Sequence, residues 1–155
     1  MSKKKSPSVP ARSAGLDPYF RRDQAAGISG PDLSKHCTFA EHIVHARGKR
    51  TRYTSVSLDL RKIRDFGEQS YRLECEQVAA DEHCLVEHSP LIEELQRVAR
   101  EEDKAERLRA VAALRYAKRR KEGLVDWKFP IPASLPRKDL IAWAEGRVQP
   151  YFSKV

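Results

Sequence analysis

Cysteines and long apolar runs are both scarce in this chain of 155 residues. The cysteines number three, which is odd, and they lack the dense spacing of a secreted disulfide framework: Cys37, Cys75 and Cys84. Reduced thiols in a cytosol-like compartment are therefore expected. No apolar run approaches the roughly 20 residues that span a bilayer, so no membrane span is predicted.

The N-terminus has a positive start but no apolar segment behind it, so no signal peptide is expected. We expect residues 1–15 to form a disordered basic tail and residues 16–155 to form a single domain, because this length supports one core and one site. A cytoplasmic protein, or one delivered into a target-cell cytosol by an external system, fits these features.

A metal site is not predicted either. Cysteine and histidine gather in one region, but they include no C-x-x-C pair, and their spacing does not suit a tetrahedral zinc site: Cys75, His83, Cys84 and His88.

Positive charge is abundant instead. The net charge of +8 and a pI near 9.6 favour anionic partners such as nucleic acid, a membrane surface or a phosphate-bearing ligand. Two basic clusters, KRTR at residues 49–52 and RYAKRRK at residues 115–121, could bind a phosphate backbone, although the second equally complements the dipole of a helix end. A non-enzymatic basic module that binds nucleic acid or protein therefore stays open as an alternative.

Residue patterns in the first half of the chain predict short, mixed elements. Tyr53 to Leu58 favours a strand in which Tyr53, Ser55 and Ser57 share one face. The other predicted elements are a strand ending near Arg22, a helix from a Ser34 cap to about Ala46, a short helix capped by Asp59, and a strand from Tyr71 to Val78.

In the second half, the dipeptide Ser89-Pro90 predicts a helix start, and an amphipathic stripe continues to Lys121 with a break expected near Asp103. The remaining predictions are a strand from Leu124 to Phe129, a turn from Ile131 to Pro136, and a short helix or strand from Asp139 to Trp143. Together these elements predict an α+β fold, with a small, split, mostly antiparallel sheet around a cleft and flanking helices.

Three motifs in order suggest a family. The run HARG at residues 45–48 precedes YTSVSLDLR at residues 53–61, and FRRD at residues 20–23 lies upstream. This succession resembles the active-site segments of mono-ADP-ribosyltransferase toxins of the cholera-toxin and heat-labile-enterotoxin class. Outside that context, two serines in a strand would be an ordinary solvated face.

The resemblance implies a site that consumes NAD as its substrate. It assigns Arg21 to the phosphates or to holding the cleft together, since a guanidinium forms paired bonds to oxyanions. It assigns Ser55 and Ser57 to the nicotinamide floor and to orienting a catalytic carboxylate. His45, near the ribose, and Arg47 are the remaining expected NAD contacts.

A late catalytic glutamate completes the site in this family, within a Glu-x-Glu pair before an Ile-Pro turn. The corresponding stretch, KEGLVDWKFPIP from Lys121 to Pro132, has no such pair and offers Asp126 within the strand or Glu122 at its start. Either carboxylate would stabilise the cationic sugar electrostatically.

The expected function is a toxin or effector domain that transfers ADP-ribose to a macromolecular acceptor, either protein or nucleic acid. A neutralising partner protein is compatible with the same resemblance. NAD hydrolysis and a catalytically degenerate domain remain open because the Glu-x-Glu pair is missing.

Overall fold

Six antiparallel strands form the centre of the fold in the computed structural model, which describes residues 17–45 and 50–155. Their order across the sheet is β4-β5-β2-β1-β3-β6. The strands are β1 (Phe20–Asp23), β2 (Tyr53–Ser57), β3 (Gln69–Leu73), β4 (Cys84–Val86), β5 (Glu122–Asp126) and β6 (Phe152–Lys154). The helices are α1 (Phe39–His45), α2 (Cys75–Ala80), α3 (His88–Val98), α4 (Lys104–Arg120) and α5 (Arg137–Val148), with short 3-10 turns η1 (Leu60–Ile63) and η2 (Gln149–Tyr151).

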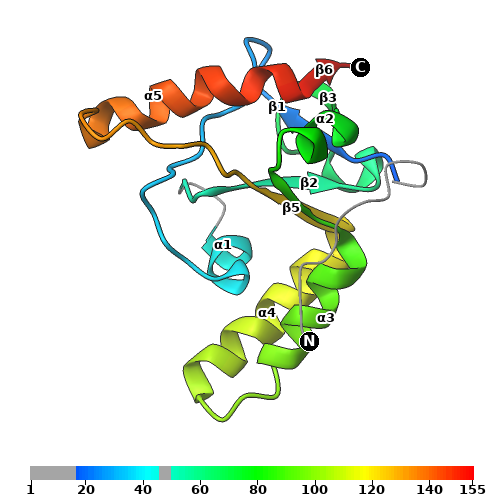
Figure 1. Cartoon of the computed structure of the whole chain (residues 1–155). Coiled ribbons are helices and arrows are strands. Elements are labelled where there is room, and N and C mark those ends of the chain that lie inside the picture. The colour runs from blue at the N-terminus through cyan, green and yellow to red at the C-terminus, as the bar shows by residue number, and fades with distance from the viewer. Residues whose placement is uncertain (1–16, 46–49) are drawn as a thin grey trace.

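Helices cover both faces of the sheet. On one side α1, α3 and α4 pack over Leu124 of β5, and Figure 1 shows α3 and α4 extending side by side away from the strands. On the other side α5 packs with Val56 and Val125, together with Val78 of α2. Neighbouring residues of β5 therefore enter different cores, as the alternation of a strand requires. The predicted α+β class with a mostly antiparallel sheet and flanking helices is confirmed.

The junction between β1 and β2 is the narrowest in the sheet. A single pair of Cα partners, Phe20 and Ser57, joins these strands, whereas β2 and β5 share five pairs and β1 and β3 share four. The sheet is continuous rather than divided into two, but its two halves diverge beyond this pair. This divergence leaves room for a pocket.

Two predicted elements in the first half need correction. The first helix begins at Phe39 rather than after Ser34, because Thr38 and Glu41 form a capping box in which each side chain accepts from the other's amide, at 3.1 and 2.8 Å. The predicted strand Tyr71–Val78 ends at Leu73 and is followed by helix α2, which turns Val78 into the core. Val78 breaks the strand alternation, and burial of its side chain favours the helix.

Predictions in the second half are closer. The long helix is broken, as expected, and Asp103 caps its second part by accepting from the amide of Glu106 at 2.9 Å. Strand β5 begins at Glu122, two residues before the predicted start. The segment predicted as Asp139–Trp143 belongs to the longer helix α5, and strands β4 and β6 have no counterpart among the predictions.

Two sequence predictions, the tail of residues 1–15 and the role of Arg47, lie outside the described residues. Within the described part of the chain, none of the helices is both long enough and apolar enough to cross a bilayer.

Candidate functional site

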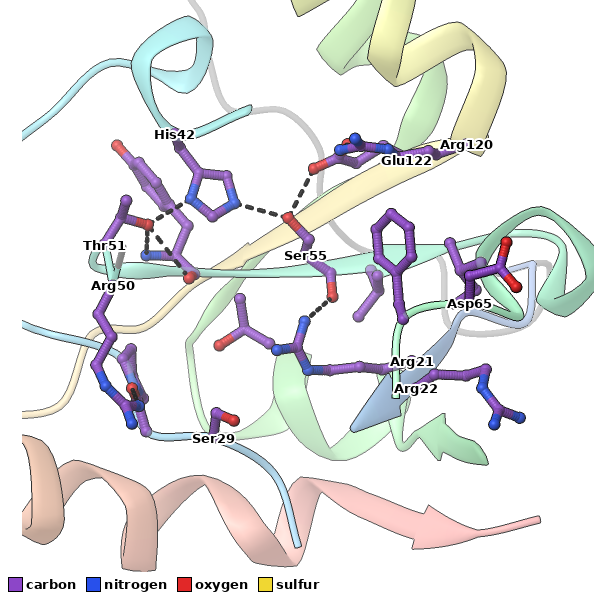
Figure 2. Close-up of a pocket in the computed structure, with 17 residues that line it drawn as sticks. Arg21, Arg22, Ser29, His42, Arg50, Thr51, Ser55, Asp65, Arg120 and Glu122 are labelled. Carbon is purple, nitrogen blue, oxygen red and sulfur yellow. Dashed lines mark hydrogen bonds and ion pairs between the residues drawn. The ribbon is translucent and has the colours of Figure 1, made fainter. Parts of the chain in front are cut away.

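A pocket of about 540 Å³ lies where β1 and β2 diverge. This volume falls within the range of about 300–1,000 Å³ that is common for small-molecule sites. Its walls come from β1, β2, the start of β5, helix α1, the end of α4 and the loop after η1 (Figure 2). Three residues from the sequence prediction line it together: Arg21, Ser55 and Glu122.

Ser55 occupies the centre of a hydrogen-bond chain. Its hydroxyl donates to Oε2 of Glu122 at 2.6 Å, and Nε2 of His42 lies 2.7 Å from the same oxygen (Figure 2). On the other side of the ring, Nδ1 of His42 contacts the hydroxyl of Thr51. With Ser55 donating to the carboxylate, the neutral imidazole donates from Nε2 and accepts from Thr51 at Nδ1.

Glu122 is the most deeply buried acidic group of the pocket, with 2 % of its side chain exposed. Burial raises the pKa of this carboxyl, against the hydrogen bond from Ser55 and the charges of Arg120 and Arg21. Its second oxygen, Oε1, has no hydrogen-bond partner among the described residues, and Nη1 of Arg120 stays 3.9 Å away. A buried acceptor without a donor is costly, so a ligand hydroxyl would be favourable here once the side chains that cover this oxygen move aside.

His42 was not predicted as a site residue; the sequence analysis selected His45 instead. Burial, together with the charges of Arg21 and Arg120, lowers the pKa of His42 to about 3. His45 is exposed at the end of α1 and does not line the pocket. Helical spacing carried the missing signal. His42 lies three residues after Phe39 and next to Ile43, and both of these residues pack in the core between α1 and the sheet.

Arg21 connects the two diverging strands. Its Nη1 donates to the carbonyl of Ser55 and its Nε donates to Oδ2 of Asp23, both at 2.8 Å. Burial opposes the ionisation of Asp23, but the charge of Arg21 and hydrogen bonds from Ser29 hold its pKa below the ordinary value. Arg21 thus bonds β1 to the backbone of β2 at the wall of the pocket.

Ser57 and Asp126 lie outside the pocket. The Ser57 hydroxyl is buried and donates to the carbonyl of Arg120 at 2.5 Å, while it accepts from the amide of Asp59 at 3.0 Å. Asp126 pairs with Arg52 and Lys128, at 3.4 and 2.9 Å. It lies four residues beyond Glu122 on β5, which corresponds to about 13 Å along a strand. Of the two predicted carboxylates, Glu122 is therefore the one that meets Ser55.

Four arginines line the pocket and make it strongly cationic: Arg21, Arg22, Arg50 and Arg120. Arg22 is bound to Gly67 and Ser70, and Arg50 donates to the carbonyl of Gly30 at 2.7 Å. Each guanidinium carries five N–H groups, so these bonds leave donors for an anionic ligand. Phosphate groups of a ligand could bind these guanidinium groups.

A second hollow of about 730 Å³ lies between α2 and α5 and is lined by Phe129, Trp143 and Tyr151 among others. It contains none of the predicted site residues. The first pocket, although smaller, is the one that brings acidic, hydroxyl and guanidinium groups together.

Searches with the chain against family models, curated proteins and solved structures find no significant match. A buried carboxylate oriented by a hydroxyl, beside several guanidinium groups, can stabilise a cationic reaction centre on a ligand that also carries phosphate.

Proposed function

We propose that the chain is an NAD-consuming enzyme of the mono-ADP-ribosyltransferase type, with a fold of that kind. The observation that carries the proposal is the convergence of Arg21, Ser55 and Glu122 on one pocket from three different strands. These residue types are the ones that the resemblance to the cholera-toxin class requires of an NAD site. The narrow junction between β1 and β2 supports the same fold, because it opens the sheet where the ligand would enter.

Cleavage of NAD at the ribose requires a negatively charged group beside the sugar. When the bond between nicotinamide and ribose breaks, positive charge develops on the ribose, and a fixed carboxylate lowers the free energy of that transition state. Glu122 suits this role because Ser55 fixes one of its oxygens, while Oε1 is left to accept from a ribose hydroxyl. A hydrogen bond at Oε1 would also relieve the cost of the unpartnered oxygen.

The arginines suit the other end of NAD. A pyrophosphate carries charge that the arginines lining the pocket can neutralise, because each keeps N–H donors beyond the bonds that Arg21, Arg22 and Arg50 make to neighbouring oxygens. Nicotinamide would then lie toward Ser55 and Tyr53, between the sheet and α1. No Glu-x-Glu pair is needed for this arrangement, because Glu122 alone supplies the carboxylate.

Release of nicotinamide from NAD by the purified protein tests the proposal. We expect steady release from the wild-type chain, and a loss of about 10–100-fold in Ser55→Ala, since the carboxylate then loses the group that orients it. Ser89→Ala is the matched control, because Ser89 is exposed at the start of α3. A folded wild-type protein that releases no nicotinamide would contradict the proposal and leave a degenerate domain.

A further inference from the structure

We propose that the acceptor of ADP-ribose is a single-stranded nucleic acid, held across the C-terminal turns of α4 beside the mouth of the pocket. This inference rests on the proposed function and adds the substrate class that the same site would modify. Its basis is a surface beside Arg120 that combines two exposed cations with the exposed ring of Phe66 and the half-buried ring of Tyr116, which we call the α4 platform: Phe66, Arg115, Tyr116 and Arg119.

The cations of the platform are available to a ligand. Arg115 and Arg119 are both exposed and lie one turn apart on α4, and the guanidinium of Arg119 is 5.5 Å from the centre of the Tyr116 ring. Among the described residues, no ion pair joins either guanidinium to an acidic side chain. Helix dipole compensation explains cations in the last turn, but it does not extend to Arg115, which lies before that turn.

Aromatic rings connect this surface to the pocket. The guanidinium of Arg120 is sandwiched between two rings, 4.9 Å from the centre of Tyr116 and 5.0 Å from the centre of Phe66. Phe66 nevertheless remains 42 % exposed, an unusual degree for a phenylalanine, and it lines the pocket. One face of its ring is thus covered by Arg120, while the ring still offers apolar surface at the pocket mouth.

An exposed ring beside cations is a combination that binds single strands. Unpaired bases stack on aromatic side chains, and lysine and arginine neutralise the connecting phosphates. An acidic protein surface would also be attracted by the cations, but it does not require an exposed ring beside the reaction centre. The pairing of stacking surface and charge therefore favours a nucleic acid over an acidic protein.

The position of the platform also suits the transfer step. Arg120 belongs to both the platform helix and the pocket wall, and Glu122 follows it by two residues. The bond between nicotinamide and ribose breaks, and nicotinamide leaves with the bonding electrons. A hydroxyl or nitrogen of the nucleotide at Phe66 then bonds to the same ribose carbon, and its proton passes to Glu122 and from there to water.

The experiment uses the full chain with biotin-labelled NAD and equal amounts of single-stranded RNA, single-stranded DNA, duplex DNA and an acidic carrier protein. We expect label on a single-stranded oligonucleotide. The double variant Arg115→Glu/Arg119→Glu is expected to lose at least about tenfold in both labelling and oligonucleotide affinity, while nicotinamide release without acceptor stays at the wild-type rate. The slope of log affinity against log salt should fall by about 1.4, at about 0.7 per cation for a single strand.

Lys138→Glu/Lys154→Glu is the matched control, because it makes the same change in charge at exposed positions of α5 and β6. Figure 1 places α5 on the opposite side of the sheet from α4. Label on the carrier protein, with nicotinamide released but oligonucleotides unlabelled, would overturn the nucleic-acid acceptor and leave the proposed function intact. Equal losses in both double variants would overturn the α4 platform. Absence of nicotinamide release in every reaction would overturn the proposed function itself.

Discussion

The hydroxyl of Ser55 on β2 donates a 2.6 Å hydrogen bond to Oε2 of Glu122 on β5. The two residues are not directly opposite each other in the sheet, since Ser55 is paired with Leu124 and Ser57 with Glu122. The bond therefore runs diagonally between neighbours on one face, a distance that long side chains can cover. It fixes a buried carboxylate at the wall of the pocket.

Acid should destabilise the protein through His42. Its folded pKa, about 3, is lower than its ordinary value of 6.5, so the unfolded chain binds the proton more tightly and stability falls as pH drops below 6.5. Between about pH 6.5 and 5 this residue should remove about 2 kcal/mol, from about 1.5 pH units at about 1.36 kcal/mol each. Urea unfolding at several pH values measures the slope. His42→Gln should flatten it, whereas an unchanged slope would contradict a buried neutral imidazole.

His83 provides the comparison for that measurement. It is also buried, and burial lowers its pKa despite the nearby charges of Asp81 and Asp126. His83→Gln should therefore remove the part of the slope that persists in His42→Gln.

Glu122→Gln should stabilise the folded protein at neutral pH. Burial raises the folded pKa of Glu122, so the folded state holds the proton more tightly than the unfolded state, and the charged form costs stability above that folded pKa. Removing the charge should therefore raise the free energy of unfolding at about pH 7. The gain should disappear in acid, where the wild-type carboxyl is protonated. Chemical unfolding at both pH values checks this, and a variant less stable at neutral pH would contradict it.

Ser57→Ala should reduce stability rather than turnover. The variant leaves the amide of Asp59 and the carbonyl of Arg120 without their partner, at a cost of about 1–3 kcal/mol. Nicotinamide release below the unfolding temperature should stay within about twofold of wild type, because Ser57 does not line the pocket. Thermal unfolding and kinetics measured on the same sample distinguish this variant from Ser55→Ala. Equal losses of activity in the two variants would show that both serines serve the ligand.

Gly67→Ala should destabilise the loop that carries Phe66. The backbone of Gly67 has φ +146°, and an added Cβ would lie 2.8 Å from the backbone nitrogen of Asp23. Such strain costs about 1–3 kcal/mol. Gly146→Ala is the control, because it lies within α5 with nothing near its Cβ and should gain about 0.5–1 kcal/mol. Opposite signs in thermal unfolding are expected; a neutral Gly67→Ala would contradict the close approach.

Local patterns predicted the parts of the fold that local forces decide. Asp59 caps a short turn as expected, with its side chain accepting from the amide of Arg61, and the alternation of Tyr53, Ser55 and Ser57 correctly indicated strand β2. The strand predicted through Val78 failed because burial of that side chain depends on partners elsewhere in the chain. Strands β4 and β6 are three residues each and are defined by pairing with β5 and β3, so short-range propensity carries little signal for them.

The residue types that gather in the pocket were more predictable than the choice among neighbouring residues of one type. Arg21 and Ser55 meet as expected, but the sequence could not distinguish Glu122 from Asp126, since that choice depends on where β5 starts. Similarly, His42 rather than His45 reaches Ser55, because Ala40 and Ile43 pack against the sheet and thereby turn His42 toward it. The position of a residue along a strand and the rotation of a helix are both set by tertiary packing. The first left Glu122 and Asp126 undistinguished, and the second led to the choice of His45 over His42.

Nicotinamide release by Glu122→Gln and Asp126→Asn, compared with wild type, tests the central claim most directly. Both substitutions remove one negative charge from β5, but only Glu122 lines the pocket and binds Ser55. We predict a loss of about 100-fold or more in kcat for Glu122→Gln, from removed charge stabilisation, and a change within about twofold for Asp126→Asn. Equal rates for Glu122→Gln and wild type, or a loss confined to Asp126→Asn, would contradict the account.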